Sequence, residues 1–274
     1  MDTLTVLMDN THNGLRTTVS EHGLSFLLKV KGKQFLFDTG ASGSFLTNAQ
    51  LMNEDLHQVD TVILSHSHYD HSGGLRTAAE HLSLTSLITG VGFFRPKYSG
   101  YGPMYNYHGC GFDQKYINQK GIAHTEVAES LECADGVFIV GGFHHHYVFE
   151  TTNSLFVVKQ GNEFIRDDFQ DEIACVLDRP EGLTLITGCS HPGILSMIVD
   201  IKKRFNKPVC RVIGGAHLSK ETPERLSRTC DELVHLGVKE TFFCHCSGSM
   251  ITSMLQDVPL ITSYALTTAD ELIL

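Results

Sequence analysis

Residues 63–75 read ILSHSHYDHSGGL and gather three histidines and an aspartate directly after an apolar run. His66 and His68 lie two positions apart, so they point to the same side if the strand extends to them. Asp70 and His71 then fall in the turn, and the glycine pair that follows lets the backbone turn tightly into a helix. Solvated loop histidines are the alternative, but four metal-ligand side chains in six residues favour a metal site.

Three further histidines follow apolar runs elsewhere in the chain. His191 lies in LTLITGCSHPGI, His217 in CRVIGGAHL and His245 in TFFCHCSGS. Each alone could be an ordinary partly buried histidine, but three such strand ends in one sheet favour a shared site. One turn cannot complete two coordination shells, so these histidines are the candidates to complete them. We therefore expect two divalent ions about 3.5 to 4 Å apart, the spacing at which paired ions clamp a reacting group.

Short β-branched and aromatic runs predict that the chain begins with sheet, and strand alternates with helix in the second half. No linker or fixed-period repeat divides the chain, so we expect one domain over residues 1–274, with sheet packed between helices. Residues 93–118 are rich in Gly, Pro and Tyr, which predicts a loop excursion whose aromatics favour a lid over disorder. We expect strands at 4–9, 24–30, 34–40, 61–66, 137–140, 154–159, 173–178, 183–187, 208–213 and 240–244, and helices at 44–52, 72–81, 193–205, 221–236 and 248–256.

The composition argues against several classes of partner. The 274 residues include 31 acidic and 21 basic side chains, for a formal charge of -10, and no basic block is longer than KKR at 202–204. Such a chain attracts nucleic acid and anionic membranes weakly, so we expect a small-molecule partner.

No apolar run is long enough for a bilayer span and the first residues lack a signal-peptide pattern, which predicts a cytoplasmic protein. Eight scattered cysteines predict reduced thiols, and 16 histidines favour metal binding. The sequence leaves a homo-oligomer open.

Several motifs together resemble one known family. The pattern HxHxDH followed by GG, an upstream FDTG and the later strand-end histidines are similar to the metallo-β-lactamase superfamily. That resemblance implies an α/β fold, a four-layer αβ/βα sandwich with a dinuclear metal site. Further stretches resemble the subgroup named after dihydropterin aminobenzene-phosphate synthase: MDN (8–10), EHGLSFLL (21–28), LFDTG (36–40), DFQDE (168–172), GLTLITGCSHPGI (182–194), GGAHL (214–218) and HCSG (245–248).

The resemblance also implies roles for single residues. Around one metal it implies the first histidine set, His66, His68 and His191, and around the other the set Asp70, His71 and His245. Asp38 of FDTG resembles an aspartate that orients a ligand histidine or the turn, although it could simply cap a turn.

Most superfamily hydrolases present a bridging Asp at the strand end that reads VIGGAHL here, and this chain has His217 in that place. Because neutral imidazole bridges two ions poorly, we expect His217 to contact substrate or transfer a proton. The candidate catalytic residues are therefore Asp70 and His217. Candidate substrate contacts from subgroup-like motifs are Asn10, Glu21, His22, Glu172 and His217, with turn chemistry as the alternative for Glu21.

Two features have more than one interpretation. The stretch GGFHHHYVFE carries His144, His145 and His146 where relatives tend to carry an arginine, so a phosphate-binding cation is absent or replaced there. On a strand only His144 and His146 could share an accessory ion. Thiolates bind zinc well, but for Cys189 and Cys244 the sequence favours packing as small buried apolar residues.

The leading hypothesis is a metal-dependent hydrolase of a small anionic, phosphorylated compound, because two ions would activate water and polarise a phosphoryl or acyl oxygen. The resemblance to the synthase implies another use, in which the site binds a phosphorylated substrate and assists carbon-bond formation by loss of pyrophosphate. A non-catalytic ligand-sensing module is a third hypothesis, because the bridging acid is missing. A di-iron oxidoreductase is disfavoured, since such relatives usually carry an acid in place of His68. Zinc suits the imidazoles, whereas manganese or iron suits a site that also offers carboxylate.

Overall fold

The computed structural model describes residues 1–12, 14, 17–151 and 153–274. Within these residues the strands form two seven-stranded sheets and one four-stranded sheet. The first sheet has the order β18 (Glu271–Ile273), β1 (Thr3–Met8), β2 (Ser25–Val30), β3 (Lys33–Phe37), β4 (Val59–Ile63), β5 (Ser86–Gly90) and β8 (Ala123–Val127). The second has the order β17 (Thr262–Ala265), β16 (Glu240–Phe243), β15 (Val209–Gly214), β14 (Gly182–Thr187), β13 (Ala174–Arg179), β10 (Val137–Val140) and β9 (Ser130–Ala134).

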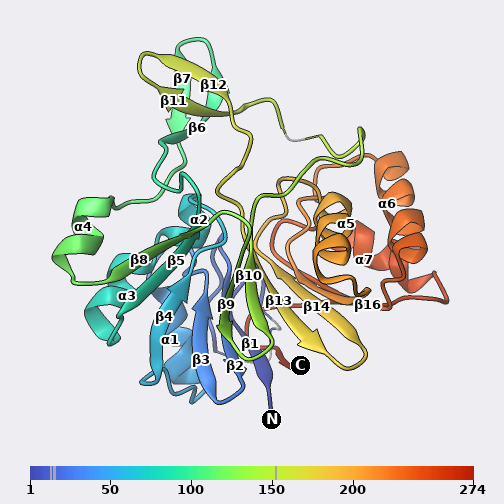
Figure 1. Ribbon diagram of the computed structural model, residues 1–274, viewed down its shortest axis with the longest axis horizontal. Helices are drawn as coiled ribbons and strands as arrows, with labels where there is room; N and C mark the ends of the chain where they lie inside the picture. Colours follow the sequence, from blue (N-terminus) through green and yellow to red (C-terminus); the bar gives the residue numbers. More distant parts are fainter. Residues whose placement is uncertain (13, 15–16, 152) are drawn as a thin grey trace.

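Helices cover the outer face of each seven-stranded sheet (Figure 1). The first sheet is covered by α1 (Ser44–Leu51), α3 (Leu75–His81) and α4 (Gln114–Gln119), and the second by α5 (Ile194–Phe205), α6 (Pro223–Leu236) and α7 (Ser249–Gln256). The inner faces of the two sheets share one apolar core. This arrangement confirms the expected four-layer αβ/βα sandwich, in which sheets meet face to face between helical layers.

Side-chain alternation explains how one strand serves two apolar layers. On β2, Phe26 and Leu28 enter the core between the sheets, while Leu27 packs against the helices on the other face. Strands that are buried on both faces read as continuous apolar runs rather than as alternating ones. Because the core between the sheets joins residues from both halves of the chain, we infer that residues 1–274 form one domain.

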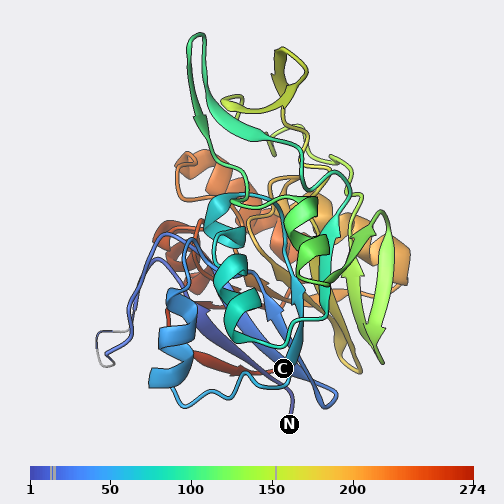
Figure 2. The same ribbon diagram turned by 90° about the vertical axis from the view of Figure 1, so that its left-hand side faces the viewer.

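The stretch 93–118 differs from the loop expected there. It contains β6 (Lys97–Tyr101), β7 (Met104–Tyr107) and most of the helix α4. In the four-stranded sheet β6 pairs with β7 on one side and with β11 (Phe156–Gln160) on the other, and β11 pairs with β12 (Glu163–Arg166). This sheet projects from the sandwich at the end opposite both chain termini (Figures 1 and 2). The pairing of β6 with β11 joins residues far apart in sequence, so local composition could not indicate it.

The carboxyl ends of the parallel strands meet at the same end of the sandwich. Strands β3, β4, β5 and β8 run parallel to one another, and so do β14, β15, β16 and β17. The short helix α2 (Tyr69–Ser72) follows β4 at this end. In such folds ligands bind outside the carboxyl ends of the strands. Within the described residues, no helix combines the length and the apolar character needed to cross a membrane.

Candidate metal centre

The structure brings the six predicted ligand residues together. His66, His68, Asp70 and His71 lie in the turn after β4 and in α2, whereas His191 and His245 follow β14 and β16 of the other sheet. All six residues are buried. The two predicted ligand sets therefore lie where the strand ends of both sheets meet.

Asp38 holds the histidine turn in place through its two carboxylate oxygens. Its Oδ1 accepts a hydrogen bond from the Ser65 backbone N–H at 2.7 Å, and its Oδ2 accepts one from the Ser65 hydroxyl at 2.7 Å. The same Oδ2 lies 2.7 Å from His71 Nδ1. Because a carboxylate accepts hydrogen bonds, His71 carries its proton on Nδ1 and presents the lone pair of Nε2 to the site.

The Ser65 hydroxyl also determines the orientation of His66. Its single proton points to Asp38, so its oxygen accepts a hydrogen bond from His66 Nδ1, which is 3.0 Å away. His66 Nε2 is then a bare lone pair. Among the described residues this buried atom has no hydrogen-bond partner, and neither does His68 Nε2. Burying a ring nitrogen without a hydrogen-bond partner costs free energy, and a metal ion bound to the lone pair would remove that cost.

Asn10 and Asp9 fix His245 in the same way. Asn10 Oδ1 lies 2.9 Å from His245 Nδ1 and accepts the Gly23 backbone N–H at 3.2 Å, while its amide donates to the His245 carbonyl at 3.2 Å. The His245 backbone N–H donates to Asp9 Oδ1 at 2.7 Å. The Asn10 oxygen thus faces His245 Nδ1–H, which leaves the His245 Nε2 lone pair facing the site.

Three ligand atoms converge with the spacing of a metal shell. His71 Nε2 lies 3.1 Å from His245 Nε2 and 3.7 Å from Asp70 Oδ2, and His245 Nε2 lies 3.3 Å from the same carboxylate oxygen. Ligands about 2.0 to 2.1 Å from a tetrahedral ion are separated by about 3.3 Å, so these distances fit zinc. Two lone pairs and a carboxylate oxygen repel one another unless a cation lies between them. The residues present therefore fit a metal ion.

The first histidine set is equally compact. The ring centroids lie 4.7 Å apart for His66 and His68, 4.9 Å for His66 and His191, and 5.1 Å for His68 and His191. Burial lowers the pKa of each of these imidazoles well below its ordinary value, and neighbouring cationic groups add to the effect. They are therefore neutral at pH 7, as metal ligands must be.

The second set carries the charge of the site. Burial raises the pKa of Asp70, but the charge of His71 outweighs it and helps to hold the pKa below its usual range. Burial lowers the pKa of His71, yet Asp38 and Asp70 raise it to about 9. The field at this position favours a cation strongly enough to hold a proton there when no metal ion competes for it.

Several site residues have a strained backbone. Asp38, Ser190, His217 and His245 have φ values of 60°, 62°, 52° and 53°, in the left-handed region that non-glycine residues rarely occupy. Phe169, with φ of 50°, stacks on the His191 ring with centroids 3.9 Å apart. Strain of this kind concentrates at functional sites, where the surrounding structure maintains it.

A buried ion pair supports the histidine turn from the side of the four-stranded sheet. Lys97 of β6 donates to Asp167 at 2.7 Å and to Asp171 at 2.6 Å, and its Nζ lies 4.2 Å from the Phe169 ring centroid. Asp171 also accepts the backbone N–H of Ser67 at 2.9 Å, between the two histidines of the turn. Lys97 is only 1% exposed, so this pair is shielded from solvent.

The candidate substrate contacts have different surroundings. His22 lies 3.3 Å from Asp70 and stacks on His245 with ring centroids 5.2 Å apart. Glu21 accepts the backbone N–H groups of Ala41 and Ser42, at 3.0 and 3.1 Å, which is the turn role given as its alternative.

Glu172 accepts the backbone N–H groups of Ser190 and His191, at 2.5 and 3.0 Å. Burial raises the Glu172 pKa to about 8 although these two hydrogen bonds lower it. The described structure therefore uses Glu172 to hold the His191 turn, as it uses Asn10 to hold His245. Whether either residue also contacts substrate stays a prediction.

His217 lies beside the first histidine set, with its ring centroid 4.4 Å from that of His191. Its backbone N–H donates to Cys246 Sγ at 3.2 Å, and in the described part of the chain its Nδ1 has no partner. Burial lowers the His217 pKa, but a hydrogen bond with Cys246 and the charge of that thiolate raise it above its ordinary value. His144 and His146 instead contact Asp200 on α5, at 3.3 and 2.7 Å.

A cavity of about 630 Å³ opens onto these residues. Four of the six predicted ligand residues line it, namely His68, Asp70, His191 and His245. The four-stranded sheet and its connections contribute Ser99, His108, Leu155 and Phe156. Lys220 is the one Lys or Arg among its described lining residues. The segment 93–118 therefore lines the cavity, and the sequence missed Phe156 and Lys220 because nothing local marks them as neighbours of the histidines.

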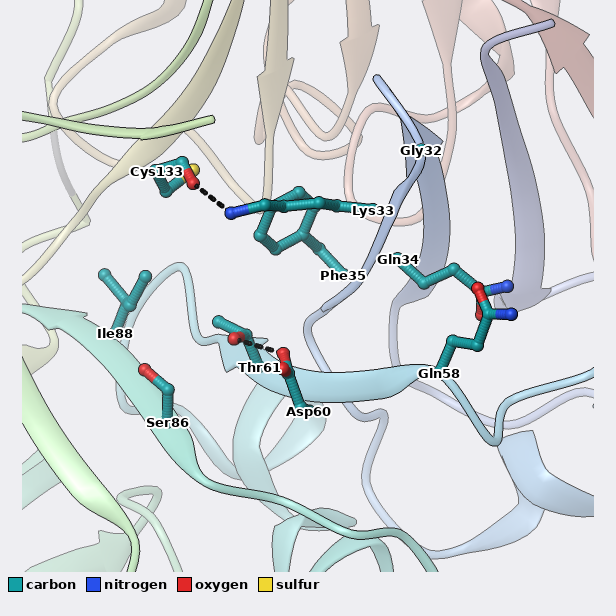
Figure 3. Close-up of a pocket in the computed structure, with 10 residues that line it drawn as sticks. All are labelled: Gly32, Lys33, Gln34, Phe35, Gln58, Asp60, Thr61, Ser86, Ile88 and Cys133. Atoms are coloured by element: carbon teal, nitrogen blue, oxygen red, sulfur yellow. Dashed lines mark hydrogen bonds between the residues drawn. The ribbon is translucent and has the colours of Figure 1, made fainter. Parts of the chain in front are cut away.

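A second cavity, of about 340 Å³, lies at the opposite ends of the parallel strands (Figure 3). It is lined by the first residues of β3, β4 and β5 and by Cys133 of β9, and Lys33 donates to the Cys133 carbonyl at 3.2 Å. None of the described groups of potential metal ligands lies here. The chemistry of the molecule is therefore concentrated at the other end.

Comparisons with known proteins agree with this fold. A family model described as the Metallo-beta-lactamase superfamily matches residues 21–205. The 7,8-dihydropterin-6-methyl-4-(beta-D-ribofuranosyl)-aminobenzene-5'-phosphate synthase of Methanocaldococcus jannaschii is 30% identical, over 87% of this chain and 85% of its own. An uncharacterized protein of the same organism, MJ0448, is 32% identical over 82% of this chain and 83% of its own. The crystal structure of Tm1679, a metal-dependent hydrolase of the beta-lactamase superfamily, has a TM-score of 0.86 and 29% identity, covering 100% of this chain and 99% of that one.

Proposed function

Because the chain belongs to the metallo-beta-lactamase superfamily, we propose that it is a metal-dependent hydrolase of a small anionic, phosphorylated compound. One observation carries the proposal: His71 Nε2, His245 Nε2 and Asp70 Oδ2 converge within 3.7 Å of one another, which is the spacing of ligands around one metal ion. The imidazoles of His66, His68 and His191 adjoin them as a second ligand set. Two divalent ions, with zinc favoured by the imidazoles, are the cofactor we propose.

Ions held there would polarise a phosphoryl or acyl oxygen and lower the pKa of water. The protein residues would bind and orient the substrate. Lys220 at the cavity rim offers a counter-charge for a phosphate, in place of the arginine missing near His144. His217 reaches the cavity with Nδ1 uncommitted among the described residues, so it is placed to give a proton to the leaving group or to hold an anionic oxygen.

The alternative function is that of a synthase, and the similarity to the methanogen synthase favours it. The same cavity and ligand sets would then bind a phosphorylated substrate while a new bond forms and pyrophosphate leaves. Both functions require an anionic oxygen at the metal sets. They differ in the product: a hydrolase consumes water and releases an alcohol or phosphate, whereas a synthase joins two substrates.

The test is a screen of phosphate esters, diphosphates and pyrophosphate-leaving substrates with metal-loaded and chelator-treated protein. We expect turnover only in the loaded form, and a double variant, His66→Ala with Asp70→Ala, to lose it. His144→Ala with His146→Ala is the matched control, because it removes two imidazoles that do not line the cavity. Full turnover by the first double variant would refute the site. Metal-loaded protein that turns over no substrate would favour the ligand-sensing module.

A further inference from the structure

Cys189 lies between the two ligand sets. Its Sγ is 3.2 Å from His71 Nε2. It forms a compact group with His66 and His191 and another with His71 and His245, the ligand atoms of each group lying within 4.8 Å of one another. Of the described residues in these groups, Cys189 alone belongs to both.

The fold explains why this thiol reaches the centre. Cys189 follows β14 after Gly188, where a side chain would lie 2.0 Å from the Ser65 hydroxyl and 3.0 Å from Asp38 Oδ2. The second sheet therefore packs its backbone directly against the support of the histidine turn. That close approach brings Sγ to the lone-pair face of His71, and Cys189 is only 3% exposed.

The geometry and the charge both suit a ligand. A tetrahedral zinc ion with nitrogen about 2.0 to 2.1 Å away and sulfur about 2.3 Å away separates those two ligand atoms by about 3.6 Å. The 3.2 Å contact lies close to that value without an ion in place. Two divalent ions carry four positive charges, and Asp70 is the one carboxylate in the two ligand sets. A thiolate shared by both ions would supply a second negative charge at a position close to both positive ions.

Resting on the proposed function, we propose that Cys189 is a metal ligand whose thiolate bridges the two ions. The S–H proton passes to solvent as the sulfur–metal bonds form, and no electron is transferred. A soft sulfur ligand favours zinc, cobalt or ferrous iron over magnesium or manganese. The site therefore discriminates among metals through Cys189 as well as through its imidazoles.

The rival position for this thiol is the group Cys189, His217 and Cys246, whose ligand atoms also lie within 4.8 Å of one another. We assign the Cys189 thiol to the histidine sets because His66 Nε2 and His68 Nε2 are buried without partners in the described chain. Cys246, in contrast, is engaged by the His217 backbone N–H. Cys246→Ser is therefore the matched control for Cys189→Ser.

The test uses the full chain loaded with cobalt, which reports thiolate ligation by a near-ultraviolet charge-transfer band. We expect the band in the wild type and in Cys246→Ser, and its loss in Cys189→Ser at equal or lower bound cobalt. Persistence of the band in Cys189→Ser, or its absence from the wild type, would overturn the proposal. Loss of the band in both variants would assign the ion to the rival group and overturn the bridge.

A crystal of the zinc-loaded wild type avoids any folding defect in the variants. We expect Cys189 Sγ at about 2.3 Å from both ions located by anomalous scattering, whereas a sulfur bound to one ion or to neither overturns the bridge. Neither readout depends on turnover. An intact band without turnover rejects the proposed hydrolase but not the ligand, and turnover without the band rejects the ligand alone.

Discussion

The substitution Asp38→Asn tests whether the hydrogen bonds below the site decide its metal affinity. Asp38 accepts three hydrogen bonds of 2.7 Å, from the Ser65 backbone N–H, the Ser65 hydroxyl and His71 Nδ1. Asparagine keeps one oxygen, which can serve the backbone N–H. Its amide NH₂ then faces two other donors, the hydroxyl and the imidazole N–H.

The simplest way to relieve that conflict moves the His71 proton to Nε2. His71 Nδ1 would then accept from the amide, and neutral His71 would carry its N–H, instead of its lone pair, on Nε2, 3.1 Å from His245 Nε2. An N–H cannot bind metal, so loading must first reverse the tautomer. Loss of such a support typically costs about 10- to 100-fold in metal affinity, which is about 1.4 to 2.7 kcal/mol.

The assay is a competitive zinc titration against a chromophoric chelator, with thermal unfolding of the metal-free proteins beside it. Asp200→Asn is the control, because Asp200 is also buried and accepts from the His144 backbone N–H at 2.7 Å and contacts His146 Nε2 at 2.7 Å, outside the cavity. We expect Asp38→Asn alone to lose affinity. Zinc affinity within about threefold of the wild type would refute the argument, since the expected loss is at least about tenfold.

Three other changes probe the structure around the site. Lys97→Met leaves Asp167 and Asp171 buried without their cation, so we expect about 3 to 5 kcal/mol loss of unfolding free energy in urea titrations; a loss below about 1 kcal/mol contradicts this. Glu150→Gln weakens three hydrogen bonds at the amino end of α5, so we expect a loss of about 1 to 2 kcal/mol of unfolding free energy by the same method. An unchanged unfolding free energy would contradict a capping role for Glu150. For Asp200, burial raises the pKa, but hydrogen bonds from His144 and His146 hold it below its ordinary value of 3.8. A depressed pKa stabilises the folded state at pH values above 3.8, and this stabilisation is lost as the pH falls through the folded-state pKa. The Tm difference between the wild type and Asp200→Asn should therefore be constant near neutrality and shrink below pH 3.8. A Tm difference that grows in acid would contradict a depressed pKa.

The sequence predicts best where the cause is local. The turn 66–71 needs only its own spacing to put four ligand side chains in one place, and the alternation of strand and helix after residue 173 follows from apolar periodicity. The expected role of Asp38 agrees with the observed contact to His71. In each case the residues involved lie on one element or on neighbouring strands.

The sequence predicts less where contacts are distant. Strand β6 pairs with β11, which follows it by about fifty residues, and β7 pairs with β6, so their aromatic composition was interpreted as a loop. Glu21 and Glu172 accept backbone N–H groups of nearby turns, and their expected contact with the substrate stays a prediction. Cys189 was interpreted as packing, because two of the histidines around it, His66 and His71, come from the other sheet.

The origin of the ligands in two sheets has an energetic consequence. The first sheet supplies the turn that holds His66 to His71, and the second supplies His191, His217 and His245. Without a metal ion, the raised pKa of His71 leaves a proton between His71 Nε2 and His245 Nε2, which lie 3.1 Å apart, and the strained backbones of Asp38 and His245 hold the two rings there. Core packing between the sheets must therefore supply the free energy that keeps the ligands facing one another. Metal binding replaces that proton and crosslinks the two sheets, so the free energy of binding adds directly to that of folding.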